Sequence, residues 1–383
     1  MAENSGPEKR ERILVRGVNW LGDAVMSTPA LLRLREARPD AHIALLTAAK
    51  LADLWQSHPS IDEVITFTKA EGVGNVSKKL RAGKFDEALI LPNSFRSALE
   101  SWMAGIPRRT GFGGSGRSML LTHVVPRRET DIEMHKRSTA EVLQLVETSP
   151  EKPRDRYPSS AHHLHNYLHL VAELGANPAP SPPRITVTDD ELAAFRAKLQ
   201  LDSTLPVIAL NPGAEYGPAK RWPAERFIKT AVRIDQSQKA IWLITGGPGD
   251  AALAKTIVGG LESQTSNESA KRIHNLAGAT TLRELCVALA ACDLVITNDT
   301  GPMHLAAAVG TPVVVPFGST SPELTGPGLP GEDRHRLVLG QAPCAPCFRR
   351  ECPIDFRCML SITPERASEH ALKVLTAARN SAP

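Results

Sequence analysis

Short apolar runs alternate along the chain with longer segments in which apolar residues recur at helical spacing. The first run, Ile13–Arg16, is followed by a loop with glycine at both ends, Gly17–Gly22, and helical periodicity then extends from Asp23 through Leu34. Strands that alternate with helices are typical of βαβ units and a parallel sheet. The pattern therefore predicts an α/β fold whose first strand begins at Ile13.

The same alternation continues in both halves of the chain. Further strands are predicted at His42–Thr47, Glu63–Phe67, Glu87–Leu91, Val207–Leu210, Ile241–Thr245, Leu294–Thr297 and Val313–Pro316. Helices are predicted at His162–Leu174, from Trp222, at Leu282–Ala291, at Pro302–Val309 and from Pro364. We expect two Rossmann-like, doubly wound domains facing across a cleft, with ligands at the carboxyl ends of the strands.

A proline-rich segment between Ser149 and Arg184 separates the two halves. Its prolines flank the predicted helix His162–Leu174, and the segment indicates the end of the first domain. The expected divisions are an N-terminal domain at 1–184, a linker at 185–206, a C-terminal domain at 207–365, and a helix and tail at 366–383.

Composition narrows the protein class. The 383 residues are 42% hydrophobic and 22% charged, and 45 Lys and Arg against 41 Asp and Glu leave a net charge of +4. That surplus is too small to indicate a nucleic-acid-binding protein. No apolar run reaches the roughly 20 residues that a membrane-spanning helix needs. Six cysteines do not make a disulfide scaffold in a chain of this size. We expect a cytoplasmic globular protein.

The loop after the first predicted strand offers a candidate base. Asp23 stands where a helix begins, and the helix dipole there favours an ionised carboxylate. Such a carboxylate could accept a proton from a sugar hydroxyl. From this segment alone, the residue pattern favours a helix N-cap over a base for Asp23.

Three loops in the second half suit a phosphate or a ribose. Asn211–Pro223 follows a strand and carries Lys220 just before a helix, so its cation and backbone amides could hold a diphosphate. Gly246–Gly249 follows another strand, and Asn298–His304 opens a helix with a threonine and a glycine. Together they outline a nucleotide-binding domain.

The most basic stretch lies in the first half. Residues 96–137 hold eight cations and four anions, a local surplus that equals the net charge of the whole chain. An anionic substrate or an acidic membrane surface would explain this, and a solvated charged face would too. Within it, Gly111–Gly116 satisfies G-x-G-x-x-G, but it follows no clear strand, so we predict a mobile loop.

Four cysteines cluster near the C-terminus with the spacing C-x2-C-x4-C-x5-C. They are Cys344, Cys347, Cys352 and Cys358. Four thiolates at this spacing could hold a zinc ion. The spacing matches neither a zinc ribbon nor the bacterial iron–sulfur run, so reduced structural thiols are the other interpretation. The histidines at 162, 163, 165 and 169 are predicted to decorate one helix face.

Three motifs in this order resemble the bacterial lipopolysaccharide heptosyltransferases, glycosyltransferase family 9. They are Gly22-Asp23 after the first strand, Asn211–Ala214 with Lys220–Pro223, and Asn298–His304 with Gly310–Pro312 and Phe317-Gly318. The resemblance extends from Ile13 to about Leu375. It implies a GT-B type fold, with an N-terminal acceptor domain and a C-terminal domain for an ADP-sugar.

The resemblance also implies the chemistry. Heptose would pass from ADP-heptose to heptosyl-Kdo2-lipid A with inversion, Asp23 acting as base and Lys220 stabilising the departing ADP. The resemblance implies neither a cofactor nor a metal. It does imply peripheral contact with the cytoplasmic face of the inner membrane. The residues implied at the donor are Gly213, Ala214, Gly246, Gly247, Asp299, Thr300, Gly301 and His304. Those implied at the acceptor are Asn19, Trp20, Asn93, Arg96, Arg108, Arg109 and Arg117.

Within the family, Leu91–Ser97 and Ala104–Gly111 are most similar to members that add the second heptose of the inner core. Three alternatives stay open. The chain could add another heptose or use another nucleotide-sugar. It could be a nicotinamide oxidoreductase of the same domain type, although it lacks a well-placed dinucleotide fingerprint. It could also be a nucleotide-sugar sensor that binds without turnover.

Overall fold

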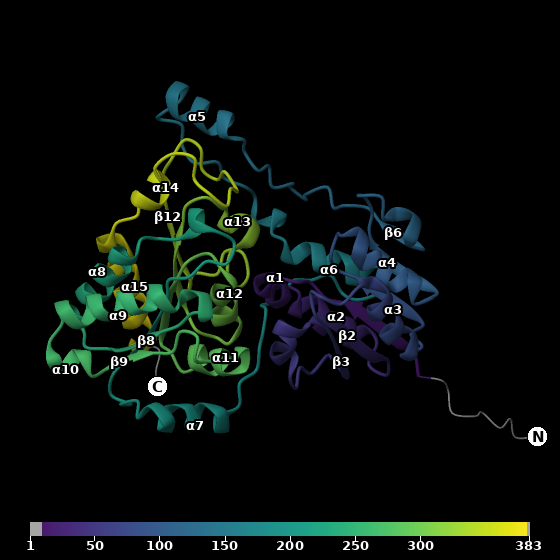
Figure 1. Ribbon diagram of the computed structural model, residues 1–383, viewed down its shortest axis with the longest axis horizontal. Coiled ribbons are helices and arrows are strands. Elements are labelled where there is room, and N and C mark those ends of the chain that lie inside the picture. The colour runs from purple at the N-terminus through teal and green to yellow at the C-terminus, as the bar shows by residue number, and fades with distance from the viewer. Residues whose placement is uncertain (1–9, 381–383) are drawn as a thin grey trace, which may run out of the picture. The chain divides into compact units, whose positions relative to one another are not determined.

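The computed structural model describes residues 10–380, which form two compact units (Figure 1). Residues 1–9 and 381–383, at the ends of the expected first domain and tail, lie outside the described residues. Unit 1 combines the chain up to Asp131 with His163–Ser181. Unit 2 combines Ile132–His162 with the chain from Pro182 onward.

Unit 1 is built on a parallel sheet with the strand order β3-β2-β1-β4-β5-β6. Its strands are β1 (Arg12–Arg16), β2 (His42–Ala48), β3 (Glu63–Phe67), β4 (Glu87–Ile90), β5 (Arg108–Phe112) and β6 (His123–Val125). The central strands are apolar runs buried on both faces, as helices on both sides of a parallel sheet require. The chain changes direction across the sheet between β1 and β4, and such a switch point is where open α/β sheets bind ligands.

The helices of unit 1 connect these strands. They are α1 (Leu21–Met26), α2 (Thr28–Ala37), η1 (Ala49–Trp55), α3 (Val73–Ala82), α4 (Phe95–Met103), η2 (Ser118–Leu120) and α6 (Leu164–Ala172). The prediction of one continuous helix from Asp23 to Leu34 is wrong. The hydroxyl of Ser27 donates to the Ala24 carbonyl at 2.8 Å, and α2 restarts one residue later with a proline in its first turn. This local hydrogen bond competes with the helix ladder and ends α1.

The glycine-rich segment also differs from its prediction. Gly111 and Phe112 belong to β5, so the segment does begin in a strand. The loop that follows leads into the short η2 turn, and no helix opens there to hold a phosphate. The dinucleotide interpretation therefore fails because the helix is missing, although a strand precedes the loop.

Unit 2 repeats the topology of unit 1, with the order β12-β11-β10-β7-β8-β9. Its strands are β7 (Val207–Asn211), β8 (Ile241–Ile244), β9 (Ile273–Asn275), β10 (Leu294–Thr297), β11 (Val313–Phe317) and β12 (Arg336–Leu339). The direction changes between β7 and β10. The second switch point therefore joins the loops that follow Asn211 and Thr297.

The helices of unit 2 form two groups on opposite sides of its sheet (Figure 1). α8 (Ala224–Ser237) packs against α9 (Ala251–Gln264) and α15 (Pro364–Asn380), whereas α11 (Leu282–Ala290) packs against α7 (Asp189–Leu199) and α12 (Gly301–Ala308). The remaining helices are α5 (Thr139–Thr148), η3 (Ser159–Ala161), η4 (Pro218–Lys220), η5 (Pro248–Asp250), α10 (Asn267–Ala270), α13 (Pro322–Thr325) and α14 (Arg357–Leu360). The fold class expected from the sequence, an α/β chain with two doubly wound sheets, is confirmed.

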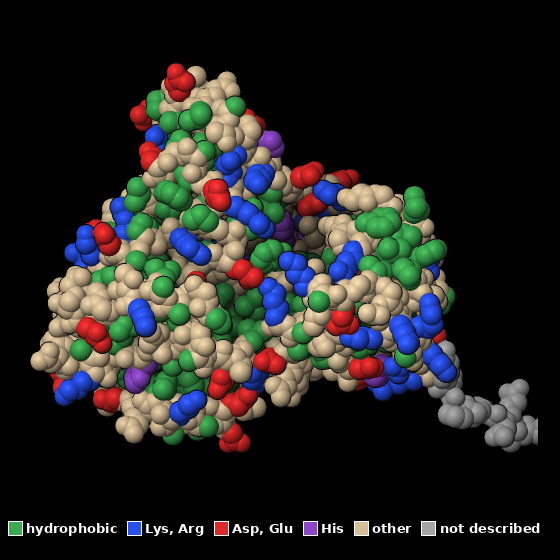
Figure 2. Space-filling model, in the orientation of Figure 1, with side chains coloured by type: hydrophobic (Ala, Val, Ile, Leu, Met, Phe, Trp, Pro, Cys, Tyr) green, Lys and Arg blue, Asp and Glu red, His purple; other side chains and the backbone are tan. Residues whose placement is uncertain are grey.

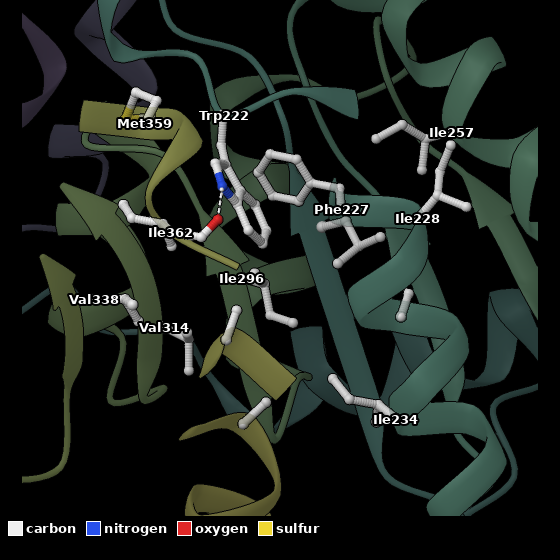
Figure 3. Packing of buried hydrophobic residues seen from close by; sticks show 14 of the residues in the cluster. Trp222, Phe227, Ile228, Ile234, Ile257, Ile296, Val314, Val338, Met359 and Ile362 are labelled. Atoms are coloured by element: carbon white, nitrogen blue, oxygen red, sulfur yellow. Dashed lines mark hydrogen bonds between the residues drawn. The ribbon is translucent and has the colours of Figure 1, made fainter. Parts of the chain in front are cut away.

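Trp222 anchors the segment that leads into α8. The sequence predicted a helix from Trp222, but α8 begins at Ala224 and Trp222 is a core residue, 2% exposed. Its ring meets the edge of Phe227 with centroids 5.2 Å apart, and its indole N–H donates to the Ile362 carbonyl at 3.1 Å (Figure 3). A buried indole with a satisfied N–H fixes its backbone firmly. The loop just before it carries Lys220.

The domain boundaries differ from those expected in two places. Residues 132–162 belong to unit 2, and the expected linker at 185–206 contains α7. The first difference follows from Arg154, 5% exposed, whose guanidinium donates to the carbonyls of Phe317 and Gly318 at 3.1 and 2.9 Å and to that of Thr320. These charge-assisted hydrogen bonds hold the segment that carries Arg154 in unit 2.

Among residues 10–380, no helix could cross a membrane.

A buried histidine after η1 makes the stability of unit 1 depend on pH. Nδ1 of His58 accepts the Ser60 N–H at 3.3 Å, and burial lowers its pKa to about 4. Since the unfolded chain binds a proton near pH 6.5 and the folded protein does not, stability falls as pH drops from 6.5 toward 4. We expect a loss of about 2 kcal/mol between pH 7 and pH 5. Denaturant unfolding across this range measures it.

His58→Asn, which cannot titrate, should flatten this slope. His123→Asn is the matched control, because His123 is half exposed, with 53% of its side chain accessible. An unchanged slope in His58→Asn would contradict the assignment.

Candidate active site

The carboxyl ends of β1 and β4 form the first candidate site, at the switch point of unit 1. Gly17 leaves β1 with its N–H donating to the Leu46 carbonyl at 2.9 Å. A Cβ at Gly17 would stand 3.0 Å from Leu45 Cδ1 and 3.2 Å from the Leu46 carbonyl oxygen. Glycine therefore lets the loop turn close against β2 before α1 begins.

Asp23 is the third residue of α1, and the N-cap is Trp20. The N-cap interpretation of Asp23 is therefore wrong, because its side chain stands one turn too far along the helix for that role. Asp23 Oδ1 accepts the hydroxyl of Tyr167, from α6, at 3.0 Å. The first turn still favours its negative charge through the helix dipole.

Two residues that sequence reasoning missed interact with this carboxylate: Tyr167 of α6 and His163, the N-cap of that helix. Burial, reinforced by the Asp23 charge, raises the pKa of Tyr167 well above its usual range, so the phenol stays a donor. Burial lowers the pKa of His163 although Asp23 and Asp131 oppose the shift, so its imidazole is neutral at pH 7. Their spacing of four residues on a predicted helix was the available signal, since it puts both on one face.

The histidines of this region do not share one exposed face, contrary to the prediction. His162 is fully buried in unit 2 beside the Gly326 carbonyl, with its Nε2 3.1 Å from that oxygen. His163 belongs to unit 1. The boundary between the units falls between His162 and His163, so these two neighbours belong to different units.

Tyr167→Phe removes only the hydroxyl that Asp23 accepts. We expect kcat to fall about tenfold, because a hydrogen bond to a charged group typically contributes 1.5–3 kcal/mol and orients the carboxylate. The acidic limb of the pH–rate profile should move to higher pH, because the ionised carboxylate loses a donor. Tyr157→Phe, which alters a phenol of unit 2, is the control. Loss of activity without movement of the pH limb would contradict this positioning role.

A buried charge network lies beneath the same edge. Glu100, fully buried in α4, accepts Arg16 Nε at 3.0 Å and Arg96 Nε at 2.8 Å. Arg16 also donates to Asn19 Oδ1 at 3.2 Å and lies over the Phe67 ring, 4.4 Å from its centroid. One carboxylate between two guanidinium groups leaves a positive charge below the loop that carries Asn19.

Arg117 has the strongest unmet hydrogen-bonding capacity at this edge. Its side chain is completely buried and one nitrogen donates to the Pro92 carbonyl, while Nε and Nη2 have no partner in the described chain. Burial lowers its pKa to about 10, so it remains charged at pH 7. A buried guanidinium with unmet donors suits a carboxylate or phosphate ligand. Asn93 and Trp20 are exposed at the same strand ends.

Arg108 and Arg109 lie at the opposite edge of the sheet. They begin β5, whereas Asp23 follows the end of β1, and all six strands are parallel. Arg108 pairs with Glu11 at 2.8 Å and Glu87 at 3.3 Å. Arg109 donates to the carbonyls of Ile106 and Leu120. The structure therefore does not bring Arg108 and Arg109 together with Asp23. The prediction failed because the sequence shows the charge of these two residues but not the direction of the strand that carries them.

The second candidate site lies at the ends of β7 and β10 in unit 2. Asn298 ties its loops together: Nδ2 donates to the carbonyls of Pro212 and Gly213 at 2.8 and 3.3 Å, and Oδ1 accepts the Trp222 N–H at 3.0 Å. It is fully buried. Its amide therefore sets the spacing between the segment that carries Lys220 and the start of α12.

Lys220 and Asp299 form a nearly buried ion pair at this edge. Lys220 Nζ stands 2.7 Å from Asp299 Oδ2, with side-chain exposures of 15% and 4%. The same Oδ2 accepts the Thr320 hydroxyl at 2.5 Å. Lys220 Nζ also lies 5.1 Å from the centroid of the Tyr216 ring. An ammonium has three donors, so this pair holds Lys220 in place and leaves it able to bind an anion.

The predicted donor residues around this pair have distinct environments. A Cβ at Gly213 would stand 2.5 Å from Asp250 Oδ2, and the Gly247 N–H donates to that oxygen at 3.0 Å. A carboxylate between these loops suits ribose hydroxyls better than phosphate. Ala214 is buried beside them. Gly246 precedes Gly247 at the end of β8, where a Cβ would approach Asp250 to 2.9 Å.

The start of α12 offers backbone amides beside Asp299. Thr300 is the N-cap and its side chain makes no capping hydrogen bond, which leaves the hydroxyl for another partner. Gly301 is the first helical residue, and His304 is buried in the first turn. Asp299 directly precedes the N-cap of this helix and pairs with Lys220, so the positive helix end and the ammonium lie close together, which favours a bound anion.

The four clustered cysteines are free thiols, with Cys352 half-buried and the other three buried. Burial raises the pKa of Cys358 to about 12 and raises those of Cys344 and Cys347. Within residues 10–380, no three His, Cys, Asp or Glu side chains are arranged to hold a metal ion.

Several known proteins are similar to this chain in sequence and in fold. The profile of glycosyltransferase family 9 (heptosyltransferase) matches residues 73–356. Lipopolysaccharide heptosyltransferase 2 of Salmonella typhimurium is 31% identical, over 95% of this chain and 99% of that protein. Lipopolysaccharide heptosyltransferase 2 of Escherichia coli K12 is 31% identical, over 86% and 89%. The solved structure of E. coli ADP-heptose LPS heptosyltransferase II has a TM-score of 0.73, at 27% identity, and covers 96% of this chain and 99% of that one.

Proposed function

Because the chain belongs to glycosyltransferase family 9, the heptosyltransferases, we propose that it is the enzyme that adds the second heptose of the lipopolysaccharide inner core. The fold is that of GT-B glycosyltransferases, with two Rossmann-like sheets. L-glycero-D-manno-heptose would pass from ADP-heptose to a heptose hydroxyl of heptosyl-Kdo2-lipid A. The observation that carries the mechanism is Asp23, held by Tyr167 at the switch point of unit 1.

In this mechanism Asp23 is the general base. The acceptor hydroxyl gives its proton to the carboxylate while its oxygen attacks the anomeric carbon of the donor heptose. The bond from that carbon to the ADP oxygen breaks, and the configuration inverts.

Lys220 stabilises the departing ADP. Its ammonium and the first amides of α12 are fixed charges and dipoles that meet the negative charge on the leaving phosphate. Asp299, which accepts the Thr320 hydroxyl, holds Lys220, and Asp250 beside Gly213 and Gly247 accepts ribose hydroxyls. The proposed step uses no cofactor or metal, since these groups supply the stabilisation.

The acceptor binds through Arg117, Arg96 and the loop residues Asn19, Trp20 and Asn93. The buried positive charge of Arg117 beneath this loop attracts a carboxylate or phosphate of the inner core. Arg108 and Arg109 are left out of this site, because they lie at the other edge of the sheet. The lipid part of the acceptor would stay in the membrane, so the enzyme works at the cytoplasmic face of the inner membrane as a peripheral protein.

The test measures ADP release from ADP-heptose with heptosyl-Kdo2-lipid A, with Kdo2-lipid A, and without acceptor. Release that depends on heptosyl-Kdo2-lipid A is expected. Release only with Kdo2-lipid A would instead make the protein the enzyme for the first heptose. Donor binding without release on any acceptor would contradict transferase activity and favour a sensor.

A further inference from the structure

We propose that unit 1 docks on an anionic lipid bilayer through an exposed apolar surface that α4, η2 and β6 form. This α4 patch consists of Phe95, Trp102, Met103, Met119 and Val124. Met119 is 80% exposed and Trp102 is 50% exposed, which is unusual for large apolar side chains of a globular protein. Figure 2 shows hydrophobic side chains gathered over α4 and β6.

The members of the α4 patch are neighbours in space. Trp102 and Met103 come seven and eight residues after Phe95, so all three share one side of α4. α4 packs against η2, which contains Met119. A Cβ at Gly116 would lie 4.0 Å from Phe95, and one at Gly113 would lie 2.8 Å from Val124. The loop between β5 and η2 thus joins the helix to the edge strand β6.

Cations border the α4 patch at its far end. α3 packs against α4, and Arg81 at its end donates to the Met103 carbonyl at 2.6 Å. Lys78 stands three residues earlier on the same face of α3 and is exposed. The nearby acid Glu100 is fully buried between two arginines. An apolar centre with a cationic border matches a membrane with anionic headgroups, where each Lys or Arg contributes about 1 kcal/mol.

The position of the α4 patch fits a lipid-linked acceptor, and this step rests on the proposed function. Phe95 comes directly after Asn93 and Ser94 at the carboxyl end of β4, the edge that also carries Asp23. The patch therefore begins at the proposed acceptor site and continues along α4. A bilayer on this surface would keep the acyl chains in lipid while the sugar reaches Asp23.

Sedimentation of the full chain with vesicles tests the proposal. Vesicles of phosphatidylethanolamine with phosphatidylglycerol should bind the protein, and pure phosphatidylcholine vesicles should bind it more weakly. Trp102→Ser combined with Met119→Ser should weaken binding to the anionic vesicles about tenfold, since two side chains leave the interface. Lys78→Glu should weaken it only on the anionic vesicles. Leu360→Ser is the matched control, because Leu360 is an apolar side chain of unit 2 with 44% exposure.

Each other result overturns the proposal. Equal binding of the double variant and the unchanged protein would show that the α4 patch is not the docking surface. An equal loss in Leu360→Ser would show that binding does not depend on position. A dimer that the double variant dissociates, measured by light scattering without vesicles, would assign the patch to a second copy of the chain.

Activity assays separate this inference from the proposed function. The double variant should keep its ADP release with a deacylated, water-soluble acceptor and lose it about tenfold with acceptor embedded in vesicles. Equal losses with both acceptors would overturn the docking role. If the unchanged protein uses neither acceptor, the proposed function fails, while sedimentation still decides whether the α4 patch binds lipid.

Discussion

Asp23→Asn is expected to lower kcat about a thousandfold, within the range that a lost general base costs. The amide keeps the size of the side chain and can still accept the Tyr167 hydroxyl, but it cannot take the proton of the acceptor. The Kd for ADP should stay nearly unchanged, because the donor loops belong to unit 2. Steady-state ADP release together with calorimetric ADP binding measures both.

Asp40→Asn is the matched control for this variant. Asp40 is an exposed carboxylate that precedes β2, at the edge of the sheet opposite Asp23. It should leave kcat unchanged. If Asp23→Asn kept more than a tenth of the activity, the base would have to be another group.

Lys220→Met is expected to lower kcat about a hundredfold and to weaken ADP binding, because the leaving phosphate loses its fixed cation. The change also leaves Asp299 almost fully buried without its ion-pair partner, and removing one partner of a buried pair costs about 3–5 kcal/mol. Part of the loss could therefore come from stability alone. Thermal unfolding beside ADP release separates the two effects.

The double variant Lys220→Met with Asp299→Asn isolates the catalytic part. Removing both charges should recover most of the stability, since no uncompensated charge stays buried. Turnover should remain low, because the cation at the phosphate is still missing. Recovery of turnover together with stability would reduce Lys220 to a structural residue.

Local features of the sequence determined most of the fold. The strands Glu63–Phe67 and Leu294–Thr297 have the predicted bounds, and α11 begins at Leu282 as predicted, directly after Thr281, which forms a capping box with Glu284. Apolar runs, helical periodicity and helix caps each depend on a few neighbouring residues. They can therefore be recognised from short stretches of the sequence. The two candidate sites were also predictable as loops after strands, because a parallel sheet gathers those loops at one edge.

Only the tertiary structure decided which side chains share a site. Tyr167 reaches Asp23 from 144 residues away, and Arg154 carries residues 132–162 into unit 2 through backbone carbonyls that have no sequence signature. Arg109 lies at the amino end of its strand, away from Asp23. Local sequence does not show this, because strand direction and order are set by crossovers across the whole unit. The sequence by itself thus determined the strands, their loops and the residue types at both edges. Pairings between distant segments were decided by packing, since burial energy depends on the surface that the complete fold brings together.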